Sequence, residues 1–234
     1  MIDLGSTDFF IPVPSLPRED FEKYSTHLFD VWEEFVSRTL DLPDYSLALE
    51  VEEGSVKGGG RIAVVLGALI VGIGHYGEFF HGLQTIRSQL SSVGDFLAEN
   101  ASSPFKSSGC ETKVRKHGGS LAHLQQLFNK VQRREITADQ AMVDAKALLG
   151  DDAATSPDFM CEMQNAFERM PLAHEQLPLL PVPTAEEIEF ASGERQRKPR
   201  VPRPNSIAPP PQQLRVEVWR DSKNGKKGIR VVQL

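Results

Sequence analysis

Apolar residues recur every three or four positions in several segments of the chain, the spacing of amphipathic helices. Over residues 18–40 this spacing predicts a long helix that ends before Leu42-Pro43. The same pattern predicts helices over residues 77–101, 121–131 and 137–149, and a shorter one from Ser156-Pro157 to about Met170. Thr137 and Gln140 have the spacing of a capping box, and a glycine follows residue 149.

Two other segments alternate between apolar and polar residues, which is typical of half-buried strands. Residues 45–53 alternate, and residues 56–61 could return beside them as a small N-terminal β-hairpin. Residues 214–221 and 229–234 flank an Asn-Gly turn and predict a C-terminal β-hairpin. Two strands alone are marginal in water, so we expect this hairpin to dock on a sheet edge, such as the 45–61 hairpin of the same or a neighbouring copy. Trp219 is then an assembly residue.

The most apolar stretch runs from Ile62 to Leu83, and its first thirteen residues carry no polar side chain. We interpret it as a glycine-rich apolar helix, preceded by a flexible joint at residues 58–60. A bilayer needs about 20 apolar residues, whereas a run of 10–14 is typical of a buried or interfacial helix. Lys57 and Arg61 before the run, and aromatic residues after it, are typical of membrane-interface anchors. A buried core helix, a membrane span and an interfacial helix therefore all stay open.

Small residues inside this stretch predict close helix packing, with self-association through the Gly67/Gly72 face. His75, Glu78 and His81 are three residues apart, and we interpret them as a polar cap at the end of the helix. The candidate helix-packing and membrane residues are Gly67, Gly72, Gly74, Tyr76, Phe79 and Phe80.

The predicted fold class is α+β and mainly helical. We divide the chain into a helix, hairpin and apolar-helix domain at 1–101, a linker at 102–119, a helical module at 120–171, a proline-rich linker at 172–213 and the hairpin at 214–234. Residues 1–17 are expected to be extended, and residues 100–119 to form a polar loop.

Charge is distributed unevenly between the body and the tail of the chain. The net charge is −6, but from Arg195 onward there are 11 basic and two acidic residues, a net charge of +9. The remaining 15 basic and 30 acidic residues give −15. This asymmetry indicates a tail that binds a polyanion, either nucleic acid or acidic lipid, or one that folds back on the body. The candidate polyanion-binding residues are Arg197, Lys198, Arg200 and Arg203.

Motifs that carry chemistry are sparse. The G-x-S-x-G, HExxH, CxxC and Walker A patterns are absent, and the two cysteines are far apart. We therefore predict no catalytic residue, metal or cofactor, although a site assembled in space would leave no local motif. The N-terminus lacks the basic and apolar segments of a secretory signal, so we expect a location in the cytoplasm or on the cytoplasmic face of a membrane.

Residues 121–149, LAHLQQLFNKVQRREITADQAMVDAKALL, resemble the SHOCT helical hairpin, a short C-terminal module of many bacterial proteins. The shared features are spaced leucines, an Ile-Thr pair and a Lys-x-Leu-Leu end, whereas the usual turn glycine is missing. The resemblance implies a bacterial setting and an interaction role.

Three functions remain open from the sequence. The first is a non-enzymatic, membrane-associated interaction or assembly protein of bacterial or phage type that forms homo-oligomers. The second is a soluble assembly protein whose basic tail binds nucleic acid or another subunit. The third is an enzyme whose site is not visible in the sequence. We also expect a protein partner for the C-terminal hairpin.

Overall fold

The computed structural model describes residues 1–13, 15–108, 112–171 and 214–234. The chain divides into one compact unit, Met1–Leu172 with Pro211–Leu234, and a second, Ala173–Pro210, which lies outside the described residues. The elements of the first unit are β1 (Ile2–Ile11), α1 (Arg18–Thr39), β2 (Ser46–Glu52), β3 (Val56–Val64), α2 (Leu66–Gly74), α3 (Phe79–Ser102), the 3-10 helix η1 (Ser103–Ser108), β4 (Lys113–His117), α4 (Gly119–Gln132), α5 (Ala138–Leu149), α6 (Asp151–Thr155), α7 (Pro157–Arg169), β5 (Leu214–Arg220) and β6 (Lys227–Gln233).

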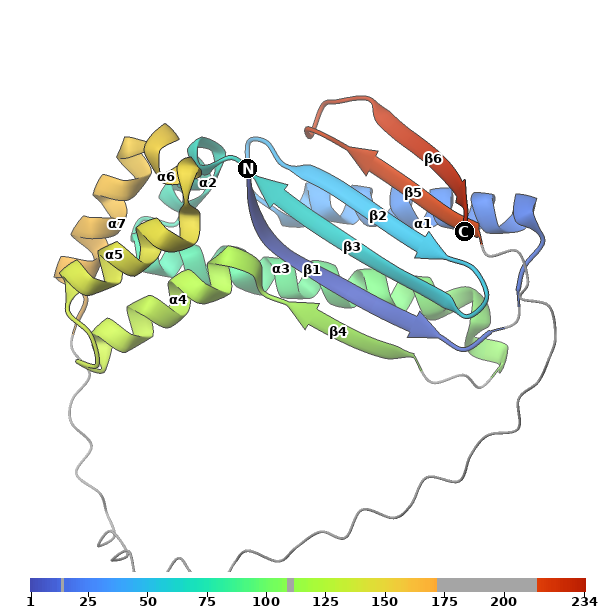
Figure 1. Cartoon of the computed structure of the whole chain (residues 1–234), viewed down its shortest axis with the longest axis horizontal. Coiled ribbons are helices and arrows are strands. Elements are labelled where there is room, and N and C mark those ends of the chain that lie inside the picture. The colour runs from blue at the N-terminus through green and yellow to red at the C-terminus, as the bar shows by residue number, and fades with distance from the viewer. Residues whose placement is uncertain (14, 109–111, 172–213) are drawn as a thin grey trace, which may run out of the picture. The chain divides into compact units, whose positions relative to one another are not determined.

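The strands form one six-stranded sheet in the order β4-β1-β3-β2-β5-β6, and every neighbouring pair is antiparallel (Figure 1). The α+β fold class is therefore confirmed. The C-terminal hairpin docks on the N-terminal hairpin of the same chain, because β5 pairs with β2 from Leu47↔Arg220 to Glu52↔Arg215. This pairing confirms the prediction that the hairpin extends a sheet edge.

Helices α1 and α3 cover one face of the sheet and lie behind it in Figure 1. The alternation of the strands produces this layer, because it places Leu47, Leu49 and Val51 of β2 on the covered face. Val216 and Val218 of β5 complete that part of the core and are almost fully buried.

A group of helices made of α4, α5, α6 and α7 packs around α2 and the start of α3. Aromatic rings form its centre. Phe128 of α4 contacts Phe79 and Phe80 of α3, and it stacks on Phe167 of α7 at a centroid distance of 4.1 Å. The cap of α5 is as predicted, because the Thr137 hydroxyl accepts a hydrogen bond from the Gln140 amide.

The prediction of one apolar helix over residues 62–83 is wrong. Ile62–Val64 end strand β3, α2 is only nine residues long, and a turn with Gly77 at φ +83° separates it from α3. A continuous apolar run has no periodicity, so the pattern did not distinguish a buried strand from a buried helix. Within the part of the chain that the structure describes, no helix combines the length and apolarity needed to cross a bilayer.

Two loop predictions are also wrong. Residues 58–60 are no flexible joint, because they lie in the middle of β3 and pair with both β1 and β2. The expected polar loop at 100–119 contains η1 and the edge strand β4, which pairs with β1. The predicted extended segment at 1–17 contains β1. Of the predicted domain boundaries, 101, 119 and 171 fall inside the first unit.

Candidate functional site

The second face of the sheet carries polar side chains, and we call it the open face. In β1, the exposed Asp8 and the half-buried Phe10 alternate with the buried Thr7, Phe9 and Ile11. In Figure 1 no described helix lies over this face. The cross-strand register assigns to it Ser6, Asp8 and Phe10 of β1, Ala48, Glu50 and Glu52 of β2, Lys57, Gly59 and Arg61 of β3, Lys113, Arg115 and His117 of β4, and Arg215, Glu217 and Trp219 of β5.

Three consecutive glycines shape the centre of the open face. Gly58 and Gly60 point towards the helices, where a Cβ on Gly60 would lie 2.4 Å from Leu97 and 3.0 Å from the Trp32 ring. Gly59 points the other way and has only the Asp8 carboxylate near it, at 2.9 Å. Because Gly59 has no side chain, the middle of the open face is a depression surrounded by longer side chains.

A broad hollow of about 740 Å³ lies over this low centre. Residues from every strand except β6 line it. The volume is in the range of ligand sites, which are about 300–1,000 Å³. The hollow is wide and shallow, because its floor is a sheet surface, and this shape suits an extended ligand.

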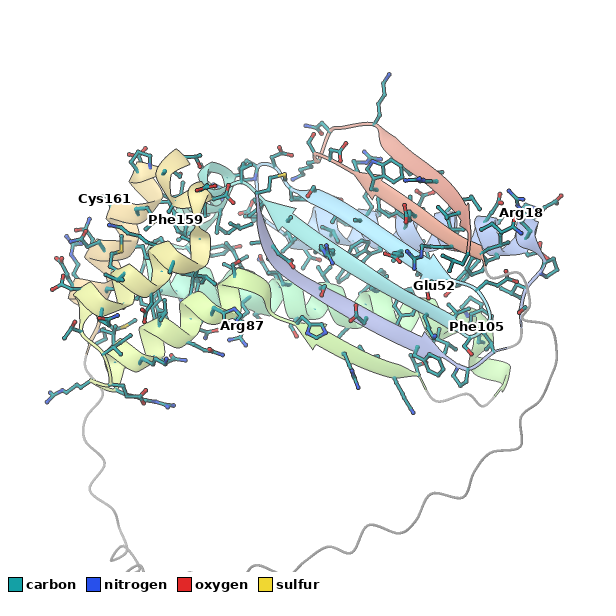
Figure 2. All side chains as sticks on the ribbon, viewed as in Figure 1. Arg18, Glu52, Arg87, Phe105, Phe159 and Cys161 are labelled. Carbon is teal, nitrogen blue, oxygen red and sulfur yellow. The ribbon has the colours of Figure 1, made fainter. Side chains whose placement is uncertain are left out.

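On the open face, β1, β2 and β5 carry the acidic side chains, whereas the charged side chains of β3 and β4 are all basic. Arg215 of β5 forms an ion pair with Glu50 at 3.0 Å and another with Glu52, which Figure 2 labels. The hydrogen bond that the Arg215 guanidinium donates to the Glu52 carboxylate raises the pKa of Arg215, so this guanidinium stays charged. At the opposite edge, His117 lies 3.3 Å from the Asp8 carboxylate. Most carboxylates of the face therefore have a basic neighbour.

Lys57 and Arg61 of β3, and Lys113 and Arg115 of β4, are exposed and form no ion pair with any described residue. Because β1 lies between β3 and β4, these cations flank it on both sides. We call these residues the basic group. Unpaired cations on one surface create a local positive potential, although the whole chain carries a net charge of −6.

Two half-buried aromatic side chains lie on the open face. Phe10 is directly opposite Lys57 on β3 and Lys113 on β4. Trp219 lies opposite Ala48 and Gly228, and a Cβ on Gly228 would come within 2.5 Å of the indole ring. Glycine at this position therefore lets the indole lie against β6.

The structure disperses the helix-packing residues that the sequence predicted. Gly67 and Gly74 are exposed with open space around them, whereas Gly72 is buried against Leu42. Tyr76 is half-buried, and its hydroxyl accepts a hydrogen bond from Gln89. Phe79 and Phe80, expected to be interface anchors, belong to the aromatic centre around Phe128. Trp219 lies on the open face. The predicted polyanion-binding residues of the tail lie outside the described residues: Arg197, Lys198, Arg200 and Arg203.

A glycine motif lies at the end of α2. Residues 72–77, GIGHYG, have the spacing G-x-G-x-x-G of a dinucleotide-binding loop. That loop joins a parallel strand to the start of a helix, whereas these residues lie at the end of α2 and in the turn that follows, next to an antiparallel sheet. The spacing therefore does not indicate a nucleotide site here.

Sequence reasoning missed the basic group and Phe10. The signal that could have found them is the alternation of Lys113, Arg115 and His117 in KVRKH, together with Asp8 and Phe10 in β1. Among the described residues, no three His, Cys, Asp or Glu side chains gather as a metal site. Comparisons with protein-family models, with curated proteins and with solved structures find nothing that matches the chain.

Proposed function

We propose that the protein is a non-enzymatic binding protein that holds a single-stranded nucleic acid on the open face. The observation that carries the proposal is the basic group, which is exposed and unpaired around the hollow. Phosphates are the natural partners of such cations, because each contact releases a condensed counterion.

Phe10 supports a nucleic acid over other polyanions. It lies between Lys57 and Lys113, so a base stacked on its ring brings the adjoining phosphates close to both ammonium groups. Proteins that bind single strands combine a basic groove with aromatic side chains in this way. Strand β1 separates β3 from β4, which therefore lie roughly 10 Å apart. This distance leaves room for one nucleic-acid strand between the two rows of cations.

The acidic side of the open face limits where the ligand lies. Glu50 and Glu217 are directly opposite each other on β2 and β5, and within the described ranges only Glu50 of the two forms an ion pair, with Arg215. These carboxylates repel phosphates, so the single-stranded nucleic acid lies over β4, β1 and β3. A flat anionic membrane would meet the basic and the acidic sides together, and it therefore suits this face less well.

The tail of the sequence adds a second basic segment. Between Arg195 and Arg203 there are five basic and no acidic residues, and only residues 204–213 separate this segment from β5. We keep the proposal that Arg197, Lys198, Arg200 and Arg203 bind the same polyanion.

The test compares two variants with the same change in net charge. The open-face variant carries Lys57→Gln, Arg61→Gln, Lys113→Gln and Arg115→Gln. The matched control carries Arg18→Gln, Arg38→Gln, Lys130→Gln and Arg133→Gln, all on α1 or at the end of α4. Binding is measured by fluorescence anisotropy of a labelled oligo-dT strand at low salt. We expect the open-face variant to bind about 10–100-fold more weakly and the control to keep its affinity. Equal losses in both variants would contradict the proposal.

A second candidate function rests on the exposed side of α2. Val65, the residue before α2, and Val71 within it are 45% and 49% exposed, and Gly67 and Gly74 lie on the exposed side of this short helix. This apolar side supports the proposal of an interaction protein that self-associates or rests on the cytoplasmic face of a membrane.

The test of the second candidate uses Val71→Ser. If the candidate is right, this change lowers binding to lipid vesicles or the oligomeric state in sedimentation experiments, while oligo-dT binding stays the same. If the unsubstituted protein is a monomer and does not bind lipid vesicles, the candidate function is wrong.

A further inference from the structure

A second cavity of about 240 Å³ lies on the covered side of the sheet, away from the open face. Its walls come from β1, β3, α1 and α3, and the junction of β4 with α4 closes one side. Ser6 and Gly60 line both this cavity and the hollow over the open face, and His117 of the open face also lines the cavity. The other residues that line the cavity belong to neither the hollow nor the open face, so the cavity is a separate feature of the fold.

The inner part of the cavity is largely apolar. Leu4 of β1, Ile62 of β3 and Val93 of α3 are all buried and line it. Gly60 and Gly94, which also line it, let the helices approach the sheet closely, because a Cβ on Gly94 would lie 2.3 Å from the Thr7 hydroxyl oxygen.

One of the residues that line this cavity carries a buried donor without an acceptor among the described residues. Trp32 is 1% exposed and lines the cavity, and its indole nitrogen Nε1 has no hydrogen-bond partner in the described part of the chain. Buried Trp N–H groups usually find a partner, and leaving one unmade is costly. The Thr7 side chain, which is 7% exposed, adds a hydroxyl to the same wall. The cavity therefore offers donors to an oxygen atom that the protein does not supply.

All titratable side chains that line this cavity are basic. They are Arg87, Lys116 and His117, and no carboxylate lines it. Lys116 is paired from outside with Asp95 at 2.6 Å, and His117 lies beside Asp8. Arg87 of α3, labelled in Figure 2, donates only to the neutral amide oxygen of Gln125 on α4. Its charge therefore has no counter-charge among the described residues.

We propose that this cavity binds a small carboxylate with an apolar body. An oxygen of the ligand accepts the hydrogen bond of the Trp32 indole, and Arg87 balances the negative charge. The apolar body contacts Leu4, Ile62 and Val93. The cavity is a little smaller than most sites for drug-sized ligands, so it suits a molecule of modest size.

The chain has two tryptophans, so a single substitution isolates the reporter. In the Trp219→Phe protein, all indole emission comes from Trp32 in the cavity. Sodium hexanoate is titrated as the probe, with hexylammonium and hexan-1-ol as ligands of similar length but different charge. We expect a saturable change in Trp32 emission with hexanoate, at least tenfold weaker binding of hexan-1-ol, and no saturable change with hexylammonium.

Variants in the same background locate the charge. Arg87→Gln is expected to weaken hexanoate binding about tenfold, Arg87→Lys to keep most of it, and Arg18→Gln on α1 to have no effect. Calorimetry on Trp32→Phe, with Trp219 in place, should show a similar loss without relying on the reporter. The proposal is overturned if hexanoate causes no saturable change, which would mean that the cavity holds water only. Equal binding of hexylammonium, or unchanged binding by Arg87→Gln in a folded protein, would also overturn it.

Discussion

Alanine should lower the stability at one of two neighbouring glycines of β3 and not at the other. Gly60 faces the helices, and its new methyl group would lie 2.4 Å from Leu97 Cδ2 and 3.0 Å from the Trp32 ring. Both neighbours are almost fully buried. Overpacking of this kind costs about 1–3 kcal/mol, offset by the about 0.5–1 kcal/mol that alanine gains over glycine in a strand. We expect Gly60→Ala to lower the free energy of unfolding by about 1–2 kcal/mol.

Gly59 faces the open side, where the methyl group would meet only the Asp8 carboxylate. Asp8 is exposed and can turn away, so Gly59→Ala should keep or raise the stability by up to about 1 kcal/mol. Urea denaturation followed by tryptophan emission measures both variants, and unchanged m-values would show that only stability changed. Each kcal/mol corresponds to a melting-temperature change of roughly 2–4 °C in a domain of this size. A flexible joint would tolerate alanine equally at both positions, so equal stabilities would refute the central-strand arrangement.

Further predictions concern α2 and the pH dependence of folding. Gly72→Ala should be less stable than Gly67→Ala by about 1–3 kcal/mol, because Gly72 contacts Leu42 and the Asp41 carbonyl whereas Gly67 faces open space; equal melting temperatures would contradict this. Burial and the nearby Glu33 carboxylate raise the pKa of Tyr45 to about 12. The unfolded chain releases this proton near pH 10 and the folded chain does not, so stability falls as the pH rises from 10 to 12. Tyr45→Phe should make that fall shallower in urea titrations, and an unchanged slope would show that Tyr45 does not contribute.

The sequence predicted those elements whose patterns are strictly local. The helix over residues 18–40 and the strand over 45–53 have one buried side each, so their periodicities of 3.6 and two are clear. The end of β3 was missed because Ile62, Val64 and Leu66 belong to one apolar run in which both strand and helix are buried. Strand β4 was missed because all five of its residues are exposed and the apolar alternation is absent.

The open face was harder to predict than its strands. Its cations come from β3 and β4, whose neighbour relation depends on β1 lying between them. The alternation in KVRKH indicates the cations of β4, but no local spacing shows that they lie near residues 57–61, because the two segments come together only through long-range pairing with β1. The C-terminal hairpin that carries Trp219 could be predicted, since its turn and the alternation around it are adjacent in the sequence.

Salt dependence of nucleic-acid binding tests the central proposal most directly. The affinity for oligo-dT is measured over a series of salt concentrations for the unsubstituted chain and for the variant with Lys57, Arg61, Lys113 and Arg115 changed to Gln. Each phosphate contact on a single strand contributes about −0.7 to the slope of log affinity against log salt, so the slope of the variant should be shallower by about 3. Identical slopes for the two proteins would show that the open face does not contact the phosphates.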